Sequence, residues 1–180
     1  MTMKLIHDVC IADTARVRGE VILGKNVSIW YGVSIRGDVA RVEIGEGTNV
    51  QDNAVIHCDY GYPNIIGSHV TIGHSAIVHG ESIGDWTLIG INAIVLGRTK
   101  IGKRCLIAAG AVVPPGMEVP DDHVVMGVPG KIVRETTDKE KKYIHELPPR
   151  YIEMSRIHAT QPTDYRVVEW NGNRPIRSDV

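Results

Sequence analysis

Three histidines in the middle of the chain, His57, His74 and His79, are the residues best suited to do chemistry. Imidazole is the commonest metal ligand, and three neutral imidazoles leave a zinc ion its double positive charge and one open position for water. Zinc lowers the pKa of that water toward about 7, which supplies hydroxide at neutral pH. Ferrous iron and cobalt(II) also suit three imidazoles, so the residues alone do not name the metal.

The element that must position these histidines is a six-residue repeat. An aliphatic residue recurs every six positions, and most of these residues are followed, four positions later, by a residue with a short side chain. No helix pattern produces this double period. The repeat predicts a stack of parallel coils in which the aliphatic side chains point inward and the coils lie about 4.8 Å apart. The aliphatic positions are Ile11, Val17, Leu23, Ile29, Ile35, Ile44, Val50, Ile56, Ile66, Ile72, Val78, Ile83, Ile89, Val95, Ile101, Ile107 and Val113.

This pattern resembles the hexapeptide-repeat family of left-handed β-helices, in which three hexapeptides make one coil. The resemblance implies a mainly β, single-stranded left-handed parallel β-helix, which we place over residues 1–133. The left hand comes from the resemblance alone, because the general crossover rule favours a right-handed connection.

The coil register groups two of the three histidines. The spacing is irregular after Ile35, Ile56 and Val78, and we interpret these irregularities as corner loops. Arg36, His57 and His79 each follow an inward residue and then lie in one outward column. Neighbours in a column are about 4.8 Å apart, close enough to share a metal through bonds of about 2.0–2.1 Å.

His74 lies one position later in its repeat, on the preceding side of the coil, so a corner separates it from the other two histidines. It can complete the set only if a neighbouring subunit presents it. A threefold homotrimer does this at each of its interfaces. A lone outward histidine is usually a solvated surface residue, and this is how we interpret the other five, which are His7, His69, His123, His145 and His158.

At these residues the sequence is similar to the γ-class carbonic anhydrases, over roughly residues 8–133 and into the C-terminal helices. The matching segments are Arg36-Gly37-Asp38, Asn49-Val50-Gln51-Asp52, His57 and Gly73-His74-Ser75-Ala76-Ile77-Val78-His79-Gly80.

The similarity implies reversible hydration of carbon dioxide by a metal-bound hydroxide, with His57 and His79 of one subunit and His74 of the next as zinc ligands. It also implies that Arg36, Asp38 and Asp52 form charged pairs across the interface, with Asn49 beside them. Gln51 would lie next to the metal-bound water and Tyr151 near the cleft.

The chain departs from the family where protons leave the site. Characterised members carry glutamates in the loops that flank the site, whereas here Val39 follows Asp38 and the loop 58–63 contains none. We therefore expect weak hydration that rises with buffer concentration.

Two other functions fit the same coil. A coenzyme A-dependent acyltransferase shares the repeat and the Gly127-Val128-Pro129-Gly130-Lys131 ending, and it uses one histidine as a base without a metal. A metal-binding scaffold without turnover is the third reading. Metal content distinguishes a carbonic anhydrase from the acyltransferase, and a carbon dioxide hydration assay distinguishes a carbonic anhydrase from the scaffold.

After the coils, Thr137 and Glu140 form a capping box that predicts a helix to about Leu147. Pro148-Pro149 should end it, and Pro149 should open a second helix to about His158. We expect both helices, over residues 134–160, to pack on the coils. Residues 161–180 form a polar tail, in which Asn171-Gly172 weakly suggests a hairpin.

Composition excludes several other classes. The net charge of -1 and the pI of about 6.7 give no electrostatic footprint for nucleic acid or an anionic membrane. The N-terminus lacks the apolar run of a signal peptide, and no segment is apolar enough to span a bilayer. We interpret Cys10, Cys58 and Cys105 as reduced thiols, and we expect a cytoplasmic protein.

Overall fold

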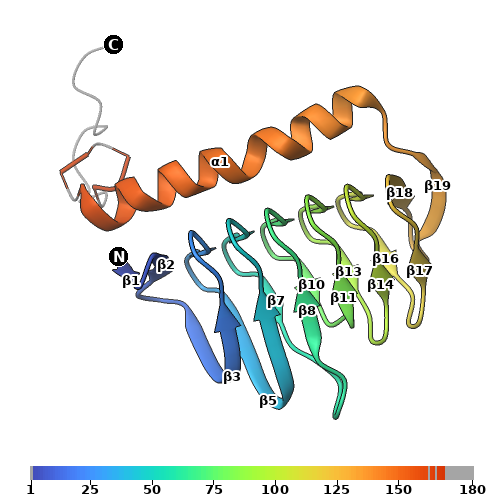
Figure 1. Cartoon of the computed structure of the whole chain (residues 1–180), viewed down its shortest axis with the longest axis horizontal. Coiled ribbons are helices and arrows are strands. Elements are labelled where there is room, and N and C mark those ends of the chain that lie inside the picture. Colours follow the sequence, from blue (N-terminus) through green and yellow to red (C-terminus); the bar gives the residue numbers. More distant parts are fainter. Residues whose placement is uncertain (1, 162, 165, 169–180) are drawn as a thin grey trace.

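The computed structural model of the chain describes residues 2–161, 163–164 and 166–168. It is a parallel β-solenoid with one α-helix running along its side (Figure 1). The strands are β1 (Met3–Ile6), β2 (Val9–Ala12), β3 (Arg16–Leu23), β4 (Ser28–Ile29), β5 (Ser34–Ile44), β6 (Asn49–Val50), β7 (Val55–Ile56), β8 (Asn64–Ile66), β9 (Thr71–Ile72), β10 (Ile77–Val78), β11 (Ser82–Ile83), β12 (Leu88–Ile89), β13 (Ile94–Val95), β14 (Lys100–Ile101), β15 (Leu106–Ile107), β16 (Val112–Val113), β17 (Glu118–Val119), β18 (His123–Met126) and β19 (Lys131–Glu135).

The short strands stack into three faces, each made of parallel pairs from successive coils. The helix-covered face contains β4, β6, β9, β12 and β15, and helix α1 (Asp138–Thr160) packs against it. The histidine face contains β7, β10, β13 and β16, whose neighbours along the chain include His57 and His79. The charged face contains β8, β11, β14 and β17. The long strand β5 bends from the histidine face into the charged face, which is why these two faces form one hydrogen-bonded sheet.

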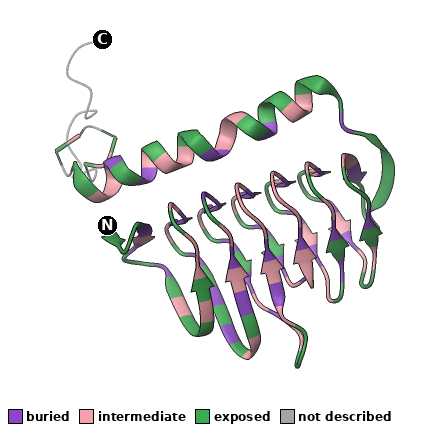
Figure 2. Cartoon of the chain, in the orientation of Figure 1, coloured by how far each residue is buried: buried purple, intermediate pink, exposed green. Residues whose placement is uncertain are grey.

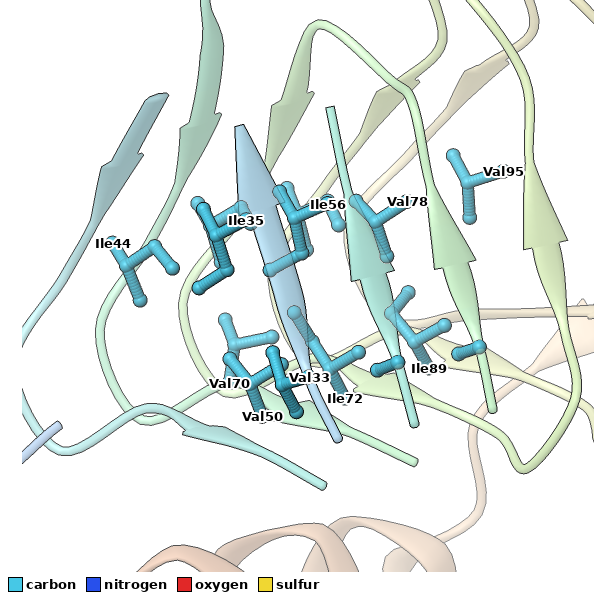
Figure 3. Close-up of a cluster of buried hydrophobic side chains, with 14 of the residues drawn as sticks. Val33, Ile35, Ile44, Val50, Ile56, Val70, Ile72, Val78, Ile89 and Val95 are labelled. Carbon is cyan, nitrogen blue, oxygen red and sulfur yellow. The ribbon is translucent and has the colours of Figure 1, made fainter. Parts of the chain in front are cut away.

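The repeating aliphatic residues form the core, as the sequence predicts. Ile35, Ile56 and Val78 are register partners on the histidine face, and each is almost completely buried (Figure 3). Most of the short residues four places later are also buried. Where such a residue is threonine, its hydroxyl donates to a backbone carbonyl of the following coil, as Thr48 Oγ1 does to Gly67 O at 2.8 Å. Thr48, Thr87 and Thr99 of the described coils thus each have a hydrogen-bond partner for the side-chain hydroxyl.

Close contact between neighbouring coils explains why glycines follow many of the aliphatic residues. A Cβ added at Gly45 would lie 2.6 Å from the carbonyl carbon of Gly67 in the next coil. No side chain fits where one backbone passes another at that separation.

The expectation of two C-terminal helices is wrong, because α1 continues through Pro148 and Pro149 as a single helix. The predicted capping box is present, with Thr137 N donating to Glu140 Oε2 at 2.8 Å. Ile144, Pro148 and Ser155 of α1 are buried, and Figure 2 shows buried segments recurring along this helix. Burial of this continuous stripe outweighs the donors lost at the two prolines, a tertiary effect that local propensity does not encode.

Both ends of the stack carry antiparallel strands. At the N-terminal end β1 pairs with β2, and at the other end β18 pairs with β19. Among the described helical residues, no segment is long and apolar enough to cross a membrane. The suggested hairpin at Asn171-Gly172 lies outside the described residues.

Candidate metal centre

His57 and His79 lie side by side on the histidine face. The strand register pairs Ile35 with Ile56 and Ile56 with Val78, which places Arg36, His57 and His79 in one column as predicted. The backbone N–H of His57 donates to Val78 O at 3.1 Å, and the two imidazole rings are 5.1 Å apart between centroids. The parallel ladder therefore holds two imidazoles at the separation that a shared metal requires.

Each of these imidazoles meets a carboxylate from outside the coil. His57 Nε2 is 2.9 Å from Asp38 Oδ1, and His79 Nε2 is 3.0 Å from Asp59 Oδ1. Both carboxylate side chains are more than two-fifths exposed, at 42% and 43%. Both Nε2 atoms are thus directed outward, away from the aliphatic core. Asp38 also forms an ion pair with Arg36, and the hydrogen bond from Arg36 is the main reason that the pKa of Asp38 is lowered.

His74 lies in a different column, next to Asp52. Its Nδ1 is 3.0 Å from Asp52 Oδ2, and its side chain is 43% exposed. An ionised carboxylate can only accept a hydrogen bond, so this contact assigns the proton of the neutral ring to Nδ1 and leaves a lone pair on Nε2. Across the described part of the chain, no three histidine, cysteine, aspartate or glutamate side chains converge as a metal site.

Gln51 is held by a chain of buried amides. Asn49 Nδ2 donates to Val70 O at 3.4 Å and to Thr71 Oγ1 at 2.9 Å, and Gln51 Nε2 donates to Asn49 Oδ1 at 3.1 Å. The Val70 carbonyl can only accept, which fixes the orientation of Asn49 and hence that of Gln51. Asn49 is 1% exposed, so it acts here by supporting Gln51.

Tyr151 approaches the same side of the coil from α1. Its ring packs edge-on against Trp30 with centroids 5.5 Å apart. Burial, and secondarily the charge of Asp52, raises the pKa of Tyr151, so its hydroxyl stays protonated at neutral pH. Tyr151, Gln51 and His74 line a pocket of about 290 Å³ between α1 and the coils.

The predicted site residues therefore form two groups within one chain. Arg36, Asp38, His57 and His79 lie together in one group, whereas Asn49, Gln51, Asp52, His74 and Tyr151 make up the other. The pairs Arg36–Asp38 and Asp52–His74 form inside the chain, and the expected charged pairs across an interface stay a prediction.

Two supporting contacts could not be identified from the sequence. Asp59 could be expected to carry protons only if it points at the cleft, and the repeat does not say which way a corner loop points. Asn64 Nδ2 donates to His57 O at 2.9 Å and to Val78 O at 3.2 Å, tying together the backbones that carry the two histidines. An asparagine at the end of a loop gives no signal of this role.

The donor set fits a divalent transition metal. Imidazole nitrogens with carboxylates close by are ligands that zinc, cobalt(II) and ferrous iron accept. One face supplies two outward Nε2 atoms, which would have to exchange their contacts with Asp38 and Asp59 for a metal, and another supplies a third imidazole whose Nε2 carries a lone pair.

Comparisons with known proteins identify the family. The six-repeat "bacterial transferase hexapeptide" family matches residues 82–115. A Methanocaldococcus jannaschii protein named "Probable carbonic anhydrase" is 47% identical over 148 residues, covering 82% of this chain and 93% of the relative. The mitochondrial gamma carbonic anhydrase 2 of Arabidopsis thaliana is 39% identical over 160 residues, covering 86% of this chain.

The chain spans only 58% of the length of that Arabidopsis relative. Among solved structures, a hexapeptide transferase family protein from Anaplasma phagocytophilum has a TM-score of 0.80 at 39% identity, with 85% of this chain and 90% of that chain covered. The identity to the Methanocaldococcus relative extends over nearly all of its length. The chain therefore belongs to the γ-class carbonic anhydrase family of hexapeptide-repeat proteins.

Proposed function

We propose that the protein catalyses the reversible hydration of carbon dioxide at a metal held between subunits of a homotrimer. The observation that carries this proposal is the His57–His79 pair, with ring centroids 5.1 Å apart and both Nε2 atoms directed outward. In this proposal His57 and His79 of one subunit and His74 of the next hold the metal. When bound, a metal with three neutral imidazole ligands supplies a water activated for attack on carbon dioxide.

The exposed side chains of the three faces support the trimer. On the helix-covered face, Leu88 is only 9% exposed. The charged face presents Glu43, Lys100 and Glu118 to solvent. The histidine face instead presents an uncovered aliphatic ladder of Val55, Ile77, Ile94 and Val112, in which Val55 and Ile77 are each 39% exposed.

An apolar ladder beside two metal ligands is the surface that a second copy would cover. A neighbouring subunit placed there could bring its His74 to His57 and His79. The aliphatic ladder thus favours assembly through the same face that bears the ligand pair.

Gln51 and Asp59 are the residues that we expect to help the reaction. Gln51 has a fixed amide orientation, so its Oε1 can accept a hydrogen bond from the reacting water or from bicarbonate. Asp59 contacts His79 directly, whereas Tyr60 is 87% exposed. Because the flanking loops contain no glutamate, transfer of the proton to solvent should limit the rate. Hydration should then rise with the concentration of an imidazole-type buffer.

The test is stopped-flow carbon dioxide hydration on zinc-, cobalt- and iron-loaded protein, with metal content measured on the same samples. We expect one metal per subunit in the trimer, and loss of both metal and activity in His74→Ala. His145→Ala is the matched control, since His145 stacks on Trp86 away from the ligands. Full metal content in His74→Ala would rule out the intersubunit site.

The same experiment separates the two alternatives. A coenzyme A-dependent acyltransferase, as the hexapeptide transferase relationship would allow, should bind acetyl coenzyme A and work without metal. A stoichiometric metal content with no hydration at any buffer concentration would instead favour a metal-binding scaffold without turnover.

A further inference from the structure

The pocket between α1 and the coils is much larger than carbon dioxide or bicarbonate needs. Its volume of about 290 Å³ would hold roughly ten water-sized groups, at about 30 Å³ each. Most of its wall is apolar: Leu88, Ile91 and Leu106 come from the coils, and Tyr143 and Leu147 come from α1. Water gains few hydrogen bonds against such a wall, which favours an organic occupant.

The hollow follows from the order of residues in one outward column. Successive coils place Trp30, Gln51, Gly73 and Gly90 at equivalent positions. Trp30 fills its position under α1 and packs against Tyr151, but the two glycines offer no side chain. The helix therefore lies over a filled surface at one end and over a recess further along the stack.

The polar groups gather at the Gln51 end of this recess. Gln51 is 5% exposed and its Nε2 is committed to Asn49, while its Oε1 accepts no hydrogen bond from any residue that the structure describes. Tyr151 likewise makes no hydrogen bond within the described chain, and its phenol stays protonated. One buried acceptor and one hydroxyl therefore face a ligand together.

The Asp52 carboxylate, which contacts the pocket residue His74, disfavours an anion at this end in the absence of a metal. A carboxylate or phosphate group would meet that negative charge, whereas a neutral hydroxyl could donate to Gln51 Oε1 and accept from Tyr151.

We propose that this pocket binds a small neutral aromatic or aliphatic alcohol, with its hydroxyl between Gln51 and Tyr151 and its apolar body against Leu88, Leu106 and Leu147. Binding needs neither metal nor turnover. Occupancy engages Gln51 Oε1, so it also lowers hydration activity; this second statement alone rests on the proposed function.

The test uses benzyl alcohol, toluene and benzoate as probes on the full chain, with side-chain methyl NMR as the readout. Benzyl alcohol should shift the methyl signals of Leu88, Leu106 and Leu147 in a saturable way. Toluene, which cannot donate to Gln51, should bind about fivefold more weakly, and benzoate should also bind more weakly than benzyl alcohol.

Leu106→Trp fills the recess and should weaken benzyl alcohol binding at least about tenfold. Ile65→Trp, on the charged face, is the matched control and should bind as the wild type does. Shifts in wild-type protein at other methyl groups only, equal affinity for toluene, or full affinity in a folded Leu106→Trp variant would each overturn the proposal.

Inhibition is measured separately, with benzyl alcohol added to the hydration assay. Binding at these methyl groups without inhibition would overturn the statement about Gln51 and leave the ligand site intact. A protein that hydrates no carbon dioxide would refute the proposed function but would not affect the NMR result.

Discussion

Removing the Asp52 carboxylate should weaken metal binding although Asp52 is not itself a proposed ligand. Asp52 Oδ2 is 3.0 Å from His74 Nδ1, and this contact sets both the tautomer and the direction of the imidazole. Loss of such a partner typically costs 10–100-fold in metal affinity. Asp52 and His74 side chains are 32% and 43% exposed, so water can replace part of the contact. We therefore expect Asp52→Ala to lower the metal affinity by about tenfold, at the low end of this range, which corresponds to roughly 1.4 kcal/mol of binding free energy.

The assay is a competition titration of zinc against a chelating dye, with the oligomeric state checked by light scattering. Asp52→Asn keeps an acceptor for Nδ1–H but not the charge, so it should retain most of the affinity. Asp121→Ala, which removes an exposed carboxylate paired with Arg104, is the control for loss of a surface charge. Wild-type affinity in Asp52→Ala, or an equal loss in Asp121→Ala, would refute the argument that Asp52 orients His74.

Three further predictions concern assembly and stability. Ile77→Glu should convert the trimer to monomers and lower metal content, whereas Ile65→Glu on the charged face should not; sedimentation measures both. Ile72→Ala removes a fully buried side chain and should cost about 2–5 kcal/mol in the free energy of unfolding by urea. Hydrogen bonds from Arg134, and then from Thr137, lower the pKa of Glu140 from 4.5 to about 2. The stabilisation that ionised Glu140 gives to the folded protein is fully present above pH 4.5 and is lost as the pH falls toward 2. Glu140→Gln should therefore lower the free energy of unfolding at pH 7 and make it depend less on pH over this acidic range.

The coil and its histidine column could be predicted from the sequence because both depend on one period. Once Ile35, Ile56 and Val78 are inward, the residue after each must share a column, and the ladder spacing sets the distance between His57 and His79. The direction of a loop has no such period, so the contact of Asp59 with His79 could not be predicted. The continuous helix was missed for a related reason, since burial of Pro148 against the coils depends on tertiary packing.

The position of α1 has a consequence for the growing chain on the ribosome. Each coil needs only its neighbours, so the stack can form in order as residues emerge. The strip of surface around Leu88 and Leu106, however, is covered by a helix that ends at Thr160. That strip stays open to the solvent during most of synthesis and is covered only when the part of α1 that carries Tyr143 and Leu147 reaches it. A chain truncated before residue 138 should therefore expose this strip and aggregate, even though its coils are complete.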